Sequence, residues 1–444
     1  MKLNRRKFNN FFISSSLFSL YPNLLRSNNL GNKVLILIEL QGANDGLNTV
    51  IPYSNNFYYK LRPNIAIKRD EILTIDKNIG LHFSLEGLAK LYENGELKII
   101  QNLGYPQPVL SHFRSIELWE TGGDGMSKGR DGWLVPSLDS ISKLSKLDAK
   151  AIHLDTAPGV FKGGLDGYLG PNSIDYNPSE LESRDSTIPT LTDNNIGLLG
   201  ELIKQRKENE INIKSLKNKL SKKNSNFRIG RGALGSQLSQ VISLIDAGVN
   251  IPVFKASMGS FDTHIDQYWK HRDLLRELSE GISDLVKNLK RIGIWNDTII
   301  MTYSEFGRRA NENGSRGTDH GMAAPHFLLG GSVKGGIFGG ELNFNKLNNN
   351  NLAFQVDYRS LYNHVLSNHF NLINNPVSPL ETIVNNDAMC EDSGSIAMLD
   401  ERAGFYTLSV QKQEYQDFQM ESLGIGRDLC HVLTRELNVE LIPE

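Results

Sequence analysis

The chain has 444 residues, of which 39% are hydrophobic and 22% are charged. This is the composition of a globular protein with a large core, and it excludes a disordered chain, a collagen and a disulfide scaffold. Its 48 basic and 50 acidic residues nearly balance, so charge favours no nucleic-acid partner. Two cysteines, Cys390 and Cys430, are too few for a cysteine zinc module, and they would pair only in an oxidising compartment.

Residues 1–31 have the pattern of a twin-arginine-type export signal. Arg5 and Arg6 lie in a basic head, and the weakly apolar run Phe11–Leu20 follows. That run is too short to span a bilayer, which takes about 20 residues, but it suits a signal peptide. We therefore expect a periplasmic or secreted protein that uses the twin-arginine export machinery. A disordered basic N-terminus is the alternative, and no later segment predicts an integral membrane span.

Short apolar runs alternate with segments of helical period between residues 32 and 375. The runs are rich in Val and Ile and end in turn residues, as buried strands do: Lys33–Leu40, Leu97–Leu103, Ile251–Ser257 and Thr298–Tyr303. Between them, apolar residues recur at helical spacing over 83–94, 234–245 and 274–289. This alternation predicts one α/β domain with a doubly wound, mostly parallel sheet flanked by helices.

Three segments depart from this pattern. Within a basic helical insertion at about 201–231, residues 204–231 hold ten basic and two acidic residues, which favours a solvated helix and leaves an anion-docking patch as the alternative. Residues 376–444 are expected to form a C-terminal extension. The glycine-rich stretch Gly330–Gly340 predicts a hairpin rather than a phosphate loop, because Lys334 precedes the glycine pair.

Polar residues follow each of the four predicted strands. In an open α/β sheet, ligands bind outside the carboxyl ends of the strands, so these residues are the candidates for a site. They are Asp45 after the first strand, Ser111 and His112 after the second, Asp262 and His264 after the third, and Glu305 after the fourth, with Asp319 and His320 close behind. Taken singly, an Asx turn explains Asp45 and a helix N-cap explains Ser111.

Taken together, carboxylates and imidazoles around a hydroxyl predict metal-assisted ester hydrolysis. Such ligands suit divalent zinc, manganese, calcium or magnesium ions, which polarise the ester and activate the attacking hydroxyl. We expect Ser111, His112 and Arg114 to be catalytic. We expect a metal to be held by Asp45, Asp262, His264, Glu305, Asp319 and His320. Arg114 or Arg308 is suited to clamp a planar anion.

Several motifs resemble the bacterial "domain of unknown function 1501" family, whose exported proteins are related to the alkaline phosphatase and sulfatase superfamily. The matching residues occur in the right order over residues 1 to 370: Arg5–Phe8, Gln41–Asn48, Arg62–Pro63, Gly80–His82, Ser111–Phe113, Phe261–His264, Ser304–Arg308, Gly317–Gly321 and Gly335–Gly336.

The resemblance implies an alkaline-phosphatase-like core. By analogy, Asp45 would be a metal ligand and Ser111 would take the nucleophile position. Asp262 and His264 would serve one metal and Glu305 the other, with His320 completing the set. One departure concerns the fourth strand end, where the superfamily usually has Asp-His and this chain has Glu305-Phe306.

Two functional hypotheses follow. The first is an exported metal-dependent hydrolase, or transferase, acting on phosphate or sulfate esters of an anionic small molecule or polysaccharide. The second is a non-catalytic envelope protein that uses a degenerate hydrolase fold for binding or assembly. The hypotheses differ in whether the candidate side chains converge.

Overall fold

A nine-stranded sheet forms the centre of the larger of two compact units, Met1–Val377 and Ser378–Glu444. The computed structural model describes residues 33–126, 128–144, 146–164, 166–171, 212–223, 227–372, 404–410 and 418–425. The expected signal segment and both cysteines lie outside these ranges. In the smaller unit, β15 (Gly404–Val410) pairs antiparallel with β16 (Phe418–Ile425).

The strand order of the sheet is β13-β5-β12-β9-β1-β8-β6-β7, and β14 also pairs with β5. The pairings make β12 antiparallel to its neighbours while the other eight strands run in one direction. The strands are β1 Val34–Leu40, β5 Leu97–Gly104, β6 Ala151–His153, β7 Tyr168–Leu169, β8 Val253–Met258, β9 Thr298–Tyr303, β12 Ala324–Gly330, β13 Gly336–Phe338 and β14 Val356–Asp357. The predicted mostly parallel α/β sheet is thus confirmed.

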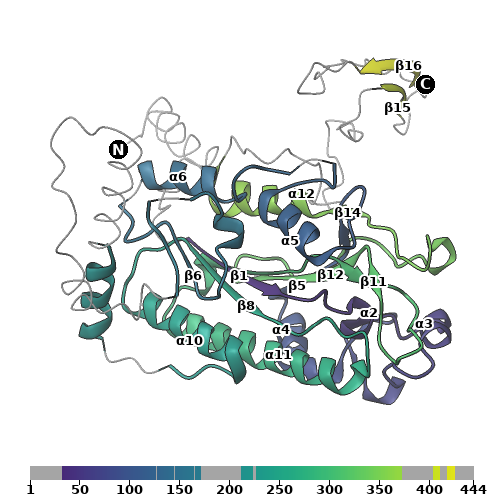
Figure 1. Cartoon of the computed structure of the whole chain (residues 1–444), viewed down its shortest axis with the longest axis horizontal. Coiled ribbons are helices and arrows are strands. Elements are labelled where there is room, and N and C mark those ends of the chain that lie inside the picture. Colours follow the sequence, from purple (N-terminus) through teal and green to yellow (C-terminus); the bar gives the residue numbers. More distant parts are fainter. Residues whose placement is uncertain are drawn as a thin grey trace, which may run out of the picture. The chain divides into compact units, whose positions relative to one another are not determined.

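Helices cover both faces of this sheet (Figure 1). One side carries α4 (Glu86–Glu93), α10 (Gly232–Asp246) and α11 (Gln267–Arg291), and the other carries α5 (His112–Thr121), α6 (Val135–Leu144) and α12 (Tyr358–His364). On α11, the buried side chains of Leu278, Ile282, Leu285 and Leu289 recur at helical spacing and join the core. Every residue of β1 is buried, as expected for a strand covered on both faces.

Smaller elements surround the carboxyl edge of the sheet. They are α2 (Gly46–Thr49), α3 (Asn56–Leu61), the small sheet of β2 (Val50–Ile51), β3 (Leu73–Thr74) and β4 (Gly80–Leu81), and the ribbon of β10 (Gly307–Arg308) with β11 (His320–Gly321). None of the helices in the described part of the chain is long and apolar enough to cross a bilayer.

Part of the basic insertion is a helix that packs on the core. Residues 212–222 are helical, and Ile213 and Leu216 are buried in the main hydrophobic cluster. Two of the basic side chains form ion pairs, Lys219 with Asp148 at 2.5 Å and Lys223 with Asp246 at 2.8 Å. The helix is therefore amphipathic rather than wholly solvated; residues 201–211 lie outside the described ranges.

The predicted glycine-rich hairpin is wrong. The strands β12 and β13 do not pair with each other but lie on opposite sides of β5, to which β12 is antiparallel and β13 parallel. The connecting turn crosses the start of β5, where Gly335 N–H donates to the Gly95 carbonyl at 2.9 Å. A Cβ on Gly335 would lie 2.6 Å from the Gly95 backbone, so the glycine permits a crossover rather than a tight hairpin.

A buried lysine joins the centre of the sheet to its margin. Lys255 on β8 is fully buried, and its ammonium contacts Glu39 on β1 at 2.9 Å and Asp155 beyond β6. The ammonium also donates to the Ala157 carbonyl at 3.2 Å. Both carboxylates are nearly buried, so each depends on Lys255 to offset the cost of its desolvation.

We expect Lys255→Met to lower the free energy of unfolding by about 3–5 kcal/mol, because two buried carboxylates lose their shared counter-ion. Guanidinium unfolding followed by tryptophan fluorescence measures the change. Lys150→Met is the matched control, since Lys150 pairs with the half-exposed Asp139 and should change stability by less than about 1 kcal/mol. Equal effects of the two substitutions would contradict this account of the core.

Candidate metal centre

The carboxyl ends of β1, β5, β8 and β9 lie at one edge of the sheet, because these four strands run in the same direction. The loop after β5 leads into α5 at His112, and the loop after β8 carries Asp262 and His264. The segment after β9 carries Glu305 and returns through the β10–β11 ribbon, which places His320 at the same edge. Three segments far apart in the sequence thus supply the side chains of one site.

Three histidine rings and one carboxylate meet there. The Nε2 atom of His320 lies 3.0 Å from Nε2 of His112 and 3.0 Å from Nε2 of His264. Asp262 Oδ1 is 3.0 Å from His264 Nε2. The same oxygen is 3.5 Å from His112 Nε2 and 3.6 Å from His320 Nε2. His112, Asp262 and His320 form a group whose potential ligand atoms all lie within 4.8 Å of one another.

The Nδ1 atom of each of the three rings contacts an oxygen atom of the protein. His112 Nδ1 contacts Glu305 Oε1 at 2.6 Å, His320 Nδ1 contacts the Leu110 carbonyl at 2.9 Å, and His264 Nδ1 lies 3.4 Å from Asp319 Oδ1. These partners accept hydrogen bonds, so they favour the tautomer that carries its proton on Nδ1 and keeps a lone pair on Nε2. Carboxylates and carbonyls orient histidines at metal sites in the same way.

This donor set fits a divalent cation. Three imidazole nitrogens and one carboxylate oxygen are ligands that zinc accepts in tetrahedral sites. Lone pairs that face one another at 3.0 Å repel unless a proton or a cation lies between them. His112, His320 and Asp262 would hold the cation, with His264 beside them. Glu305 and Asp319 would orient ligands from behind.

The Glu305 carboxylate is held by more than the histidine. Gly42 N–H donates to Glu305 Oε1 at 2.8 Å, and the Ser304 hydroxyl donates to Glu305 Oε2 at 2.9 Å. Burial raises the pKa of Glu305, but the hydrogen bonds from His112, Ser304 and Gly42 outweigh it and lower the pKa overall. The same hydrogen bond to Glu305 raises the pKa of His112. An ionised Glu305 fixes the ring of His112.

Arg308 forms hydrogen bonds with the loops that carry the candidate ligands. Its fully buried guanidinium donates to the carbonyls of Ala43 at 2.8 Å and Thr318 at 2.9 Å, and to that of Gly42 at 2.5 Å. It also donates to Asp262 Oδ1 at 2.5 Å. Although burial raises the pKa of Asp262, the Arg308 hydrogen bond and charge outweigh this and hold the pKa below its usual range.

Two glycines allow the loops to approach closely. Gly42 has φ +106°, and a Cβ there would lie 2.4 Å from the Asp262 backbone nitrogen. At Gly317, a Cβ would lie 2.2 Å from the backbone of His264. Any side chain at these positions would separate segments that carry the candidate ligands.

Comparison with protein families identifies the region that carries most of the cluster. Residues 220–370 match the model of the family described as "Protein of unknown function (DUF1501)". This region of the chain is similar to that family. It contains Asp262, His264, Glu305, Asp319 and His320, whereas Asp45 and His112 precede it. Among curated proteins, none matches the sequence.

The chain is also similar to several solved structures, with which it shares little sequence. A protein in the alkaline phosphatase superfamily from Vibrio parahaemolyticus is 12% identical, with 92% of this chain and 83% of that chain covered and a TM-score of 0.35. The C-terminal periplasmic domain of EcEptC from Escherichia coli, in complex with Zn, is 10% identical. The match covers 69% of this chain and 76% of that chain, with a TM-score of 0.32. The PsFucS1 sulfatase from Pseudoalteromonas sp. is 11% identical. The match covers 84% of this chain and 73% of that chain, with a TM-score of 0.32.

Asp45 is not among the side chains of the group that could hold a metal ion. It is fully buried and forms a paired contact with Arg62, at 2.6 Å through Oδ2 and 3.0 Å through Oδ1. Gln267 donates to Oδ2 at 2.5 Å, and Leu47 N–H donates to Oδ1 at 3.3 Å. Burial raises the pKa of Asp45, but the Arg62 charge and hydrogen bonds lower it overall. The structure thus places Asp45 in a fully buried ion pair with Arg62.

The other two expected catalytic residues flank the cluster. Ser111 is the N-cap residue of α5, immediately before His112; it is exposed, and its side chain makes no capping hydrogen bond. Arg114 pairs with Glu117 at 2.9 Å. Arg62 and Gln267 have structural roles that the sequence reasoning missed, although Arg62 belongs to one of the quoted motifs.

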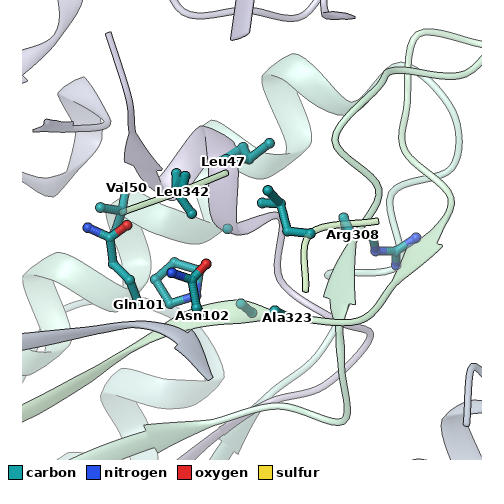
Figure 2. Close-up of a pocket in the computed structure, with 11 residues that line it drawn as sticks. Leu47, Val50, Gln101, Asn102, Arg308, Ala323 and Leu342 are labelled. Atoms are coloured by element: carbon teal, nitrogen blue, oxygen red, sulfur yellow. The ribbon is translucent and has the colours of Figure 1, made fainter. Parts of the chain in front are cut away.

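Arg308 is also one of the residues that line a separate pocket (Figure 2). Apolar side chains of Leu47, Val50 and Leu342 line it together with Gln101. The guanidinium of Arg308 points away from the other labelled residues (Figure 2). None of the clustered histidines or carboxylates lines this pocket, so it is distinct from the candidate metal centre.

We expect Asp45→Asn to destabilise the fold by about 3–5 kcal/mol without removing the metal ligands, because it leaves the buried Arg62 charge uncompensated. Chemical unfolding gives the stability, and elemental analysis gives the metal content per folded molecule. Asp273→Asn, which affects an exposed ion pair, is the control. Loss of metal with unchanged stability would instead assign Asp45 to the metal site.

Proposed function

We propose that the protein is a metal-dependent hydrolase, or transferase, of phosphate or sulfate esters. The observation that carries this proposal is the convergence of His112 and His320 Nε2 with Asp262 Oδ1, each histidine being held through Nδ1. The Nε2 atoms of His112 and His264 each lie 3.0 Å from Nε2 of His320. These rings present acceptor atoms to one point beside Asp262 Oδ1, which is the arrangement a cation requires.

The surrounding groups suit an anionic ester. A bound divalent cation would polarise the ester oxygen and lower the pKa of an attacking hydroxyl. The first turn of α5 presents backbone N–H groups at the positive end of the helix, next to His112. Ser111 at this end has the hydroxyl of a nucleophile or of a group that orients water. Arg308 would hold Asp262 in place as charge changes nearby.

The non-catalytic alternative has less support. It expects the acidic and histidine side chains to be scattered, whereas six of the residues proposed from the sequence lie in one connected group: His112, Asp262, His264, Glu305, Asp319 and His320. The capture of Asp45 by Arg62 favours a centre with a single cation over a two-metal centre.

Metal analysis combined with hydrolysis of generic aryl phosphates and aryl sulfates tests the proposal. We expect His112→Ala and His320→Ala each to lose the metal and to lower kcat/KM by at least about a hundredfold, or about 2.7 kcal/mol of barrier. Glu305→Gln should weaken metal binding by roughly 10- to 100-fold, because it loosens His112.

His364→Ala is the matched control for these variants, since His364 lies on α12 and contacts Asn368 at 2.9 Å. It should retain both metal and activity. A folded wild-type protein that binds no divalent metal and hydrolyses neither ester class would overturn the proposed reaction. Full metal content and activity in the His320→Ala variant would overturn the assignment of the site.

We further propose that the chain is exported by the twin-arginine machinery to the periplasm or beyond. Arg5 and Arg6 ahead of a short, weakly apolar run support this. A variant with both arginines changed to lysine should accumulate in the cytoplasm when cell fractions are probed by immunoblot. A variant with Lys2 and Lys7 changed to arginine keeps the pair and should still be exported. Equal export of all forms would exclude this route.

A further inference from the structure

A compact group of cations surrounds Glu117 of α5, outside the candidate metal centre. Arg114, Lys128 and Lys162 all contact the carboxylate of Glu117, at 2.9, 2.7 and 3.1 Å. We call these three cations with Glu117 the α5 basic cluster. Their side chains are between about a third and a half exposed, so the charges face solvent.

The cluster is assembled from three separate parts of the chain. Arg114 and Glu117 lie on α5, Lys128 lies in the connection from α5 to α6, and Lys162 follows a short helical turn at Gly159–Phe161. Three positive charges surround one negative charge, which leaves an excess of two. The hydrogen bonds from Lys128 and Lys162 lower the pKa of Glu117 to about 2, so the carboxylate is ionised and still does not balance the cations.

Stability of the fold does not account for this arrangement. An exposed ion pair contributes about 0–1 kcal/mol, and one cation would suffice to pair with Glu117. Each further cation adds repulsion from its neighbours. An anionic group that joined the three cations would relieve this repulsion, and arginine and lysine side chains are the usual partners of phosphate and sulfate groups.

The first turn of α5 connects this cluster to the candidate metal centre. Successive helix residues are rotated by 100°, so His112, Phe113 and Arg114 point in three directions around the end of the helix. Phe113, between the other two, is 89% exposed. Glu117 lies five residues beyond His112, about 8 Å further along the helix axis.

We propose that the α5 basic cluster binds a second anionic group of the substrate, so that the substrate class is a polyanionic ester. This inference rests on the proposed function for the reacting ester itself. One anionic ester would lie at the His112 end of α5, and another anionic group of the same molecule would lie between Arg114, Lys128 and Lys162. The organic part between them would cover the exposed ring of Phe113.

The test uses two fluorescent probes that share one ring system, pyrenetetrasulfonate and pyrenemonosulfonate. Binding to the full chain is followed by fluorescence anisotropy at physiological ionic strength. We expect the tetrasulfonate to bind at least about tenfold more tightly than the monosulfonate. The combined variant R114Q/K128Q/K162Q should abolish this preference. The variant K60Q/K68Q/K90Q, which removes the same charge from other exposed lysines, should retain it.

Glu117→Gln separates recognition from structural support. If Glu117 competes with the ligand for the cations, its neutralisation should tighten tetrasulfonate binding by about threefold or more. Unchanged or weaker binding in this variant would contradict the proposal, as would a preference that survives in R114Q/K128Q/K162Q. The unfolding midpoint of each variant shows whether a loss of binding reflects a loss of folding.

The two proposals fail in different ways. The preference for the tetrasulfonate should persist after the metal is removed with a chelator, since the α5 basic cluster needs no metal. Persistence without any ester hydrolysis would overturn the proposed reaction and leave the anion subsite standing. Hydrolysis that depends on His320, together with no preference for the tetrasulfonate, would overturn the subsite alone.

Discussion

The candidate metal centre depends on the hydrogen bonds that the buried guanidinium of Arg308 donates. Its donors bind backbone carbonyls in the loop after β1 and in the segment before β11, and they bind the carboxylate of Asp262. Moving any one of these segments would leave a buried charged donor without a partner, which is costly. The segments that carry His264 and His320 are therefore fixed relative to each other by a residue that need not touch a substrate.

The sequence could predict four of the nine strands of the sheet, β1, β5, β8 and β9, and the residues that follow them at its carboxyl edge. Apolar runs such as Thr298–Tyr303 mark strands, and parallel strands bring their ends together whatever the loops contain. Asp45 shows the limit of that reasoning. A carboxylate at a strand end suits a metal and an arginine equally well, and Arg62 comes from 17 residues further along a different loop. Only the fold decides between them.

Other details depend on groups that a sequence does not display. The Leu110 carbonyl, which orients His320, is a backbone group, so no residue type in the sequence predicts it. The insertion of β5 between β12 and β13 depends on pairing between distant strands, whereas the glycines beside them are compatible with a hairpin or a crossover. Likewise, Glu117 pairs with cations from three segments of the chain. Because these segments are separate in the sequence, the sequence alone does not indicate that the cations form a cluster.

The single reversed strand of the sheet has a consequence for how this fold can vary. Because β12 is antiparallel to β9 and hydrogen-bonded to it, the chain leaves the sheet after Tyr303 and re-enters beside the same point at Ala324. The intervening segment, which includes Glu305 and His320, is closed at its base by two adjacent strands. Evolution can lengthen, shorten or replace such a segment without shifting the register of the sheet, so the chemistry at this edge can diverge while the core stays constant.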